Sequence, residues 1–126
     1  MKRVLLAEDD PDTAAAIKAT LEERLSITVD HVTNGALVLD QAMTTRPDLL
    51  ILDISMPGLS GIDVFDLVRG NELWDTVPIL FLTAAPDKAE RAFAPDGIRV
   101  VMAKPFDSEA LVARVSDLLG RDVKAA

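Results

Sequence analysis

The sequence predicts a doubly wound α/β fold, in which helices cover both faces of a parallel β-sheet. Four short apolar runs, each bounded by turn residues, are typical of buried strands in such a sheet. Helical patterns alternate with these runs, as expected of strands joined by right-handed crossover helices. The chain has 126 residues, of which 49% are hydrophobic, so it is long and apolar enough for one domain with its own core.

The first expected strand is the apolar run 4–7. Asp10 and Pro11 then supply an N-cap and a first-turn proline, so a helix is expected to begin there. The inner face of this helix is expected to carry Ala14, Ile17, Leu21 and Leu25. The less apolar segment 27–32 predicts a second strand at an edge of the sheet.

A second helix is expected to open at Asn34 and Gly35 and to end before Pro47. Its inner side is expected to carry Ala36, Leu39, Ala42 and Met43. The most continuously apolar run of the chain, 49–52, follows as the third strand.

The segment 53–61 is rich in turn residues and predicts a loop after the third strand. The helix expected beyond this loop carries Ile62, Phe65, Leu67 and Val68. Pro78 marks the start of the fourth strand, and Pro86 and Pro95 bracket a short helix over 87–93.

The fifth strand is expected over 98–102. Asp107 or Ser108 would cap the last helix, and Gly120 would end it. The apolar stripe of this helix consists of Leu111, Val115, Leu118 and Leu119.

The formal net charge of −8 argues against direct binding of nucleic acid, because phosphate contacts need a basic surface. The sequence has no cysteine, which excludes disulfides, thiol nucleophiles and thiolate metal sites. No apolar run is long enough to cross a bilayer, and no secretory signal is visible after the first residues. We therefore expect a cytoplasmic protein with no membrane contact.

Polar residues follow four of the expected strands. They are Glu8 and Asp9, Asp53, Thr83, and Lys104. Ligands of open parallel sheets bind at the carboxyl ends of the strands, so these residues are expected to face one crevice. Carboxylate, hydroxyl and ammonium groups in one crevice are suited to a divalent cation and a phosphoryl group.

The acidic residues are the strongest part of this pattern. Acidic loops are common, and Asp10 is better explained as a helix N-cap than as a metal ligand. Glu8, Asp9 and Asp53 differ, because converging carboxylates raise one another's pKa unless a cation neutralises them. Mg²⁺ suits such a site, and a carboxylate beside it is a candidate nucleophile that forms an aspartyl-phosphate. Asp53 is the candidate for that role.

The other polar residues are weaker signals when each is taken alone. Thr83 has a hydroxyl that can donate to a phosphoryl oxygen, and Lys104 has an ammonium that can contact phosphate or Asp53. Pro105 allows a cis peptide bond that would fix the direction of the lysine. His31, the single histidine, is better explained as an ordinary strand residue than as a catalytic or phosphocarrier group.

In order and spacing, these motifs resemble the receiver domains of bacterial two-component response regulators, the family typified by the chemotaxis receiver. The resemblance rests on Glu8-Asp9, the loop 53–61, Thr83-Ala84 and the run 104–106, with 46–49 and 77–79 in support. It covers nearly the whole chain and implies a flavodoxin-like sheet of five parallel strands in the order 2-1-3-4-5. Residues 1–126 are expected to form a single receiver domain with no output domain, either as a stand-alone protein or as a domain of a longer regulator.

The resemblance implies a phosphorylation-dependent signalling switch and not an enzyme. Asp53 would accept a phosphoryl group from a phosphohistidine on a sensor histidine kinase or a histidine phosphotransfer protein. Asp9, Asp53 and the backbone carbonyl of Ser55 would bind Mg²⁺ directly, and Glu8 would hold a metal-bound water.

The same resemblance implies how the signal leaves the site. Thr83 and Lys104 would bind the phosphoryl oxygens, and their movement would change the face formed by the fourth helix, fifth strand and fifth helix. Partner binding at that face would then depend on phosphorylation, with a phosphorylation-dependent homodimer as one expected form.

Two features depart from the family pattern, and two further positions bear on the lifetime of the phosphoryl group. Val101 occupies the position that usually carries an aromatic residue coupled to the threonine, and the chain has no tyrosine. Pro86 and Pro95 lie in the segment where a Gly-Ala pair is common, so the output face is expected to be unusual. Ser55 and Ala85 lack the amide or carboxylate groups that orient attacking water, which predicts slow self-dephosphorylation.

Other classes of function remain as alternatives. Val101 keeps open a constitutive protein-interaction module, with a receiver fold whose output is uncoupled from phosphorylation. An aspartyl-phosphate phosphatase or transferase is disfavoured, because Ser55 stands where a second Asp often acts as acid or base. A flavin-binding protein is disfavoured by the acidic first loop, which would repel a phosphate.

Overall fold

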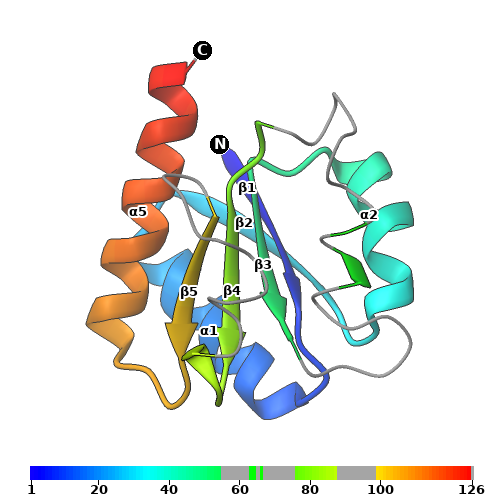
Figure 1. Cartoon of the computed structure of the whole chain (residues 1–126). Coiled ribbons are helices and arrows are strands. Elements are labelled where there is room, and N and C mark those ends of the chain that lie inside the picture. The colour runs from blue at the N-terminus through cyan, green and yellow to red at the C-terminus, as the bar shows by residue number, and fades with distance from the viewer. Residues whose placement is uncertain (55–62, 65, 67–75, 88–98, 126) are drawn as a thin grey trace.

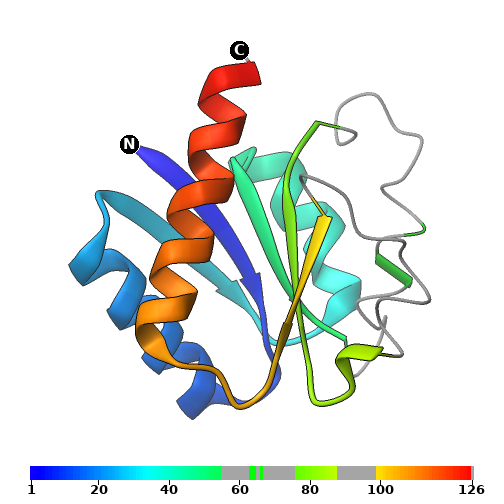
Figure 2. The same ribbon diagram turned by 60° about the vertical axis from the view of Figure 1, so that its left-hand side comes forward.

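The computed structural model describes residues 1–54, 63–64, 66, 76–87 and 99–125. These residues form a five-stranded parallel sheet in the order β2-β1-β3-β4-β5. Figures 1 and 2 show helices against both faces of this sheet. The predicted doubly wound architecture and the predicted strand order are therefore confirmed.

The burial of each strand follows its place in the sheet. The strands are β1 (Lys2–Ala7), β2 (Ile27–Val32), β3 (Leu49–Asp53), β4 (Ile79–Thr83) and β5 (Arg99–Ala103). Every residue of β3 and β4 is buried, because these strands have neighbours on both sides and helices exclude water from both faces. At the edge of the sheet, β2 is only partly buried, as its mixed sequence predicts.

Helices divide the core into two layers, because side chains point alternately to the two faces along each strand. On one face lie α1 (Pro11–Arg24) and α5 (Ser108–Ala125), and on the other lies α2 (Val38–Thr45). The layer beneath α1 and α5 includes Leu6, Ile17, Leu21, Ile51, Leu80, Leu111 and Val115. The layer beneath α2 includes Leu5, Val38, Ala42, Leu50 and Phe81.

The start of α1 agrees with the prediction. Asp10 is the N-cap, and its carboxylate accepts hydrogen bonds from the backbone N–H of Asp12 at 3.2 Å and from the hydroxyl of Thr13. Pro11 is the first helical residue. The Asp10 carboxylate therefore satisfies an otherwise unpaired donor of the helix, as expected of a cap.

The start of α2 differs from the prediction. A short 3₁₀ turn, Gly35–Leu37, comes first, and α2 begins only at Val38. Because the 3₁₀ turn is more tightly wound, it changes which side of the following helix faces the sheet. Val38 and Ala42 are buried, whereas Ala36 and Met43, which were predicted on the inner side, are exposed.

The last helix begins as predicted and ends later. Asp107 is its cap, since its carboxylate accepts from the N–H of Glu109 at 3.4 Å and its carbonyl from the N–H of Leu111 at 3.0 Å. Gly120, which was predicted to end α5, lies inside the helix. A glycine in a helix interior costs about 1 kcal/mol relative to alanine, which is too little to stop a helix that the following residues extend.

Parts of two expected helices lie outside the described residues. In the helix expected after the loop 53–61, Val64 is described and fully buried, whereas Ile62, Phe65, Leu67 and Val68 are not described. The helix expected over 87–93 is described only at its first residue. Within the described part of the chain, no helix is long and apolar enough to span a membrane.

Candidate functional site

The carboxyl ends of four strands bring the predicted polar residues together. Asp53 and Thr83 are the last residues of β3 and β4, and Glu8 and Lys104 directly follow β1 and β5. The parallel register aligns these strand ends, because the last residue of β4 pairs with the last residue of β5. The polar residues therefore gather where parallel α/β sheets bind ligands.

Lys104 lies between two buried carboxylates. Its Nζ is 2.8 Å from Oε1 of Glu8 and 3.0 Å from Oδ2 of Asp53. Glu8 is 1% exposed and Asp53 is 5% exposed, whereas the lysine side chain is 26% exposed and reaches solvent. Buried charges are tolerated only when they are paired, so these contacts hold the three side chains in one cluster.

Burial and the contacts within the cluster shift the pKa values of Glu8 and Lys104. Burial raises the pKa of Glu8 to about 7, Asp53 adds to the effect, and Lys104 opposes it. Burial by itself would lower the pKa of Lys104, but the hydrogen bonds to Glu8 and Asp53 outweigh it and raise that pKa. Lys104 therefore stays charged near neutral pH, whereas Glu8 takes up a proton readily unless a further cation is present.

Asp9 completes an acidic cluster with a composition that suits a metal ion. Carboxylate oxygens of Glu8, Asp9 and Asp53 all lie within 4.8 Å of one another. Asp9 is exposed, so one side of the cluster is open to water. A hard cation that binds oxygen ligands and keeps part of its water shell fits this donor set. One lysine cannot neutralise three carboxylates, and a divalent cation would balance the excess.

Two further predicted site residues differ in how far the structure describes them. Thr83 is 7% exposed, and its hydroxyl oxygen accepts a hydrogen bond from the N–H of Ala85 at 2.9 Å. The hydroxyl proton is then available for donation to an anion. Ser55, whose backbone carbonyl is expected to bind the cation, lies outside the described residues. The Lys104-Pro105 bond is cis, the form the proline was expected to allow.

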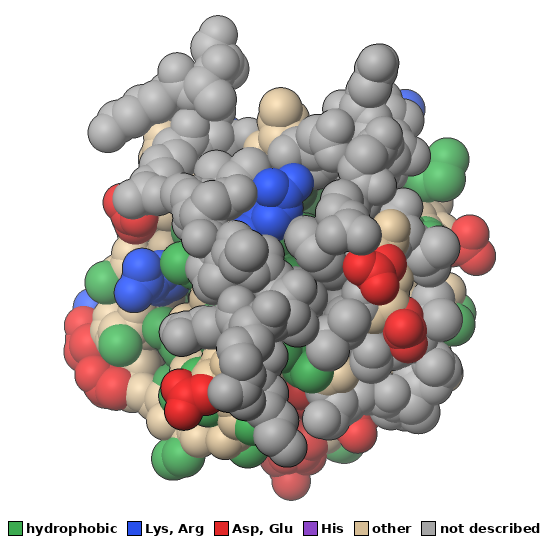
Figure 3. Space-filling view, viewed as in Figure 1, with side chains coloured by type: hydrophobic (Ala, Val, Ile, Leu, Met, Phe, Trp, Pro, Cys, Tyr) green, Lys and Arg blue, Asp and Glu red, His purple; other side chains and the backbone are tan. Residues whose placement is uncertain are grey.

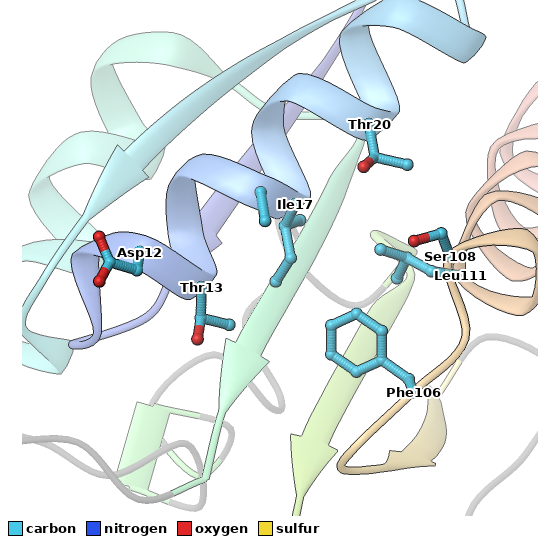
Figure 4. A pocket seen from close by; sticks show the side chains of 8 residues that line it. Asp12, Thr13, Ile17, Thr20, Phe106, Ser108 and Leu111 are labelled. Atoms are coloured by element: carbon cyan, nitrogen blue, oxygen red, sulfur yellow. The ribbon is translucent and has the colours of Figure 1, made fainter.

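One hollow on the surface borders Lys104, and a second hollow adjoins the first. A depression of about 460 Å³ is lined by Thr13, Ala84, Lys104, Pro105 and Phe106. Figure 4 shows a second hollow, a groove of about 300 Å³ between α1 and the start of α5. The groove is lined by Asp12, Thr13, Ala16, Ile17, Thr20, Phe106, Ser108 and Leu111. The two hollows share Thr13 and Phe106 and are therefore adjacent.

One contact of the site was not anticipated from the sequence. Nε2 of His31, which was expected to be an ordinary strand residue, lies 2.8 Å from the backbone oxygen of Glu8. The signal that would have revealed it is the pairing register of β1 with β2, which places His31 opposite Leu6. Register between parallel strands is not readable from either strand alone.

Acidic side chains are also present on the surface at this end of the molecule. Figure 3 shows several of them along the lower edge of the view, where the strands end in Figure 1. This distribution agrees with the net charge of −8 and favours cations over free polyanions at the site.

Comparison with known proteins gives a consistent result. The family model described as response regulator receiver domain matches residues 4–116. The transcriptional activator protein IrlR of Burkholderia pseudomallei is 38% identical over 120 residues, which are 94% of this chain and 51% of that protein. The crystal structure of a putative response regulator from Chloroflexus aurantiacus has a TM-score of 0.86 and 32% identity, over 95% of this chain and 98% of that chain.

A third relative bears on the acidic cluster. The receiver domain of a sensor histidine kinase from Pseudomonas aeruginosa has a TM-score of 0.82 and 29% identity, over 94% of this chain and 98% of that chain. A magnesium ion is coordinated in the active site cleft of that structure. The fold and the acidic pocket are thus those of a phospho-acceptor regulatory module of two-component signalling. The chain belongs to the response regulator receiver domain family, and it spans about half the length of the curated relatives first matched.

Proposed function

We propose that this chain is a phosphorylation-dependent signalling switch in which Asp53 accepts the phosphoryl group. One observation carries the proposal: the buried Asp53 carboxylate lies 3.0 Å from Nζ of Lys104, inside an acidic cluster at the open end of the sheet. A nucleophile, a fixed cation and a metal-binding donor set in one place are what phosphoryl transfer requires.

The proposed donor is a phosphohistidine of a sensor histidine kinase or a histidine phosphotransfer protein. An oxygen of Asp53 attacks the phosphorus atom, the P–N bond breaks, and its electron pair returns to the imidazole nitrogen. The product is an acyl phosphate on Asp53.

Asp9 and Asp53, with the backbone carbonyl of Ser55, would hold Mg²⁺, and Glu8 would hold a water molecule of its shell. When bound there, Mg²⁺ would spread the negative charge of the transferring group. The raised pKa of Glu8 supports this assignment, because burial disfavours the charged carboxylate and a nearby cation would offset that cost.

Thr83 and Lys104 would convert phosphorylation into a change of shape. Lys104 would exchange its contact with the Asp53 carboxylate for one with a phosphoryl oxygen, and Thr83 would donate its hydroxyl proton to another. Both lie at the ends of neighbouring strands, so their movement would bias the position of β5 and α5 between two states. Partner proteins would bind the surface that includes β5 and α5 in one of these two states. A phosphorylation-dependent homodimer is one form of such binding.

The proposal includes a slow loss of the phosphoryl group. Ala85 has no polar side chain that could orient an attacking water beside Thr83, and the Ser55 side chain offers neither an amide nor a carboxylate. Rapid phosphoryl loss from the purified protein would contradict this part of the proposal.

One observation favours a second candidate, a constitutive interaction module of the same fold. Val101 pairs with Phe81 in the sheet and packs against the core layer beneath α2. No aromatic ring stands at this position to turn inward when Thr83 engages an anion. In this alternative, partner binding is the same with and without a phosphoryl group on Asp53.

The test is the intact mass of the protein after incubation with acetyl phosphate, with and without Mg²⁺. We expect a phosphoryl adduct that requires Mg²⁺, persists in Asp40→Asn and is lost in Asp53→Asn. Asp40 is a matched control, because it is an exposed carboxylate on α2, outside the site. A folded protein that gives no adduct with Mg²⁺, acetyl phosphate and a cognate kinase would overturn the switch and favour the constitutive module.

A further inference from the structure

We propose that His31 is a positioning residue of the metal site, which holds the peptide bond between Glu8 and Asp9 in the orientation that brings Asp9 to the cluster. The inference rests on the proposed function, since it concerns how the acidic site binds Mg²⁺. It assigns a role to a side chain on β2, a strand that supplies none of the predicted site residues.

The need for such a residue arises where β2 ends. The ladder between β1 and β2 closes with the pair Ala7 and Val32, followed by a hydrogen bond from the N–H of Glu8 to the carbonyl of Val32 at 3.1 Å. In a parallel ladder, the carbonyl of Glu8 faces the same neighbour and would accept from a residue beyond Val32. The chain has left the strand by then, and the His31 ring takes the place of the missing donor at 2.8 Å.

The chemistry of this contact determines which ring atom carries the proton. A backbone carbonyl can only accept, so Nε2 of His31 must be protonated and must donate. In the neutral ring this is the tautomer with its proton on Nε2. The charged imidazolium also carries a proton on Nε2, so the contact does not act as a pH switch.

Asp9 depends on this contact more than Glu8 does. The Glu8 side chain is held by Lys104 at 2.8 Å and by the N–H of Asp10 at 3.5 Å. Among the described residues, no hydrogen bond or ion pair holds the exposed Asp9 carboxylate, so its backbone alone places it. The peptide unit is planar, so a fixed Glu8 carbonyl also fixes the N–H and Cα of Asp9. Partners behind a metal ligand typically tune metal affinity in this way.

The test compares Mg²⁺ affinity in three variants of the chain. His31→Leu removes the donor, His31→Gln keeps an N–H donor on a flexible side chain, and Thr28→Val changes the same strand at its far end. Mg²⁺ is titrated at pH 8 and followed through the backbone amide resonances of the folded protein. We expect affinity about tenfold weaker in His31→Leu, an intermediate value in His31→Gln, and no change in Thr28→Val.

Two readouts separate positioning from general destabilisation. Loss of stability alone would lower the urea midpoint but leave the dissociation constant of the folded molecules unchanged. Saturating Mg²⁺ is expected to restore the rate of adduct formation with acetyl phosphate in His31→Leu, because the nucleophile itself is intact.

The tautomer of His31 can be measured directly. Because the chain has one histidine, a long-range ¹H–¹⁵N spectrum of the wild type reports its tautomer without assignment, and protonated Nε2 is expected.

The outcomes distinguish this inference from the proposed function. Wild-type Mg²⁺ affinity in folded His31→Leu, or a neutral ring protonated only at Nδ1, overturns the role of His31 and leaves the switch intact. A wild-type protein that binds no Mg²⁺ overturns both.

Discussion

The two ends of the sheet both place carboxylates beside a cation, but in different surroundings. Near the amino end, Nη1 of Arg3 lies 3.7 Å from Oδ2 of Asp30, and these side chains are 43% and 26% exposed. At the carboxyl end, Lys104 contacts Glu8 and Asp53, whose side chains are 1% and 7% exposed. The Arg3 side chain reaches water, which weakens the first pair although Oδ2 of Asp30 is itself buried, whereas the second group depends on its own members for charge balance.

The difference shows that residue type alone does not make a site. At the amino end, Asp30 pairs with the Arg3 side chain and Asp48 accepts a hydrogen bond from the Arg3 backbone N–H, so each carboxylate has its own partner. The carboxyl end has one cation against three carboxylates, two of them buried. Excess buried charge is what a divalent cation or a charged substrate would relieve, so it marks the functional end of the molecule.

The largest effect is expected from Lys104→Met. This change leaves Glu8 and Asp53 buried without their cation, and we expect it to lower the free energy of unfolding by about 2–3 kcal/mol at pH 8 without Mg²⁺. Mg²⁺ is expected to recover most of this loss, because it supplies the missing positive charge. Urea denaturation with and without Mg²⁺ measures both effects.

Lys18→Met is the control for that experiment, because Lys18 is exposed on α1 and outside the site. It is expected to change stability by less than about 0.5 kcal/mol and to leave the effect of Mg²⁺ unchanged. An equal decrease in the free energy of unfolding in the two variants would show that Lys104 does not stabilise buried carboxylates at the carboxyl end of the sheet.

The next effect concerns pH. The pKa of Glu8 is about 7 in the folded protein and near 4.5 when unfolded, so the folded state binds the proton more tightly. Stability without metal must therefore fall as pH rises from about 4.5 to about 7. Glu8→Gln should remove this loss and be more stable than wild type at pH 8, on the order of 2 kcal/mol.

Urea denaturation from pH 5 to pH 8 tests this expectation, with the exposed Glu23→Gln as control. The curve of the control should run parallel to that of the wild type. Because the proton and the cation compete for Glu8, the apparent Mg²⁺ affinity of the wild type should rise through pH 7. A difference in stability between Glu8→Gln and wild type that does not grow from pH 5 to pH 8 would contradict the raised pKa.

These contrasts also explain which parts of the fold were predictable from the sequence. The runs that became β3 and β4 are uninterrupted and bounded by proline and turn residues, so their place and burial followed directly. Met43 was misplaced because a 3₁₀ turn before α2 changes the helix face, and no periodicity in the sequence shows that turn. Gly120 was misjudged because glycine weakens a helix without necessarily ending it.

The candidate site also has a part that could be predicted from the sequence and a part that could not. Glu8, Asp53, Thr83 and Lys104 each follow an apolar run, so the rule for strand ends was enough to bring them together. The contact of His31 with the Glu8 carbonyl depends on the register and on where β2 ends, which are properties of the folded sheet. The structure brings the strand-end residues together, whereas their roles, like that of Ser55, stay predictions.

A smaller effect is expected from Asp9→Asn. Asp9 is the exposed member of the acidic cluster, so stability without metal should change by less than about 0.5 kcal/mol. Mg²⁺ affinity should fall about tenfold or more, because the variant loses a charged oxygen ligand. Calorimetric titration with Mg²⁺ separates the two, and Asp12→Asn, an exposed neighbour at the start of α1, is the control. Unchanged Mg²⁺ affinity in Asp9→Asn would remove Asp9 from the site.

The smallest effect is expected at the amino end, where the pair of Arg3 and Asp30 can be measured by a double-mutant cycle. Arg3→Met and Asp30→Asn remove the two side-chain charges separately and together, and the backbone N–H of Arg3 keeps its 2.8 Å hydrogen bond to Oδ2 of Asp48. We expect a coupling energy below about 1 kcal/mol that shrinks further at 1 M salt, because the two atoms lie 3.7 Å apart and the exposed Arg3 side chain is open to water and ions. A coupling energy of about 2 kcal/mol or more, the size of the loss expected from Lys104→Met, would mean that burial is not what separates the two ends, and that the excess of carboxylates alone defines the site.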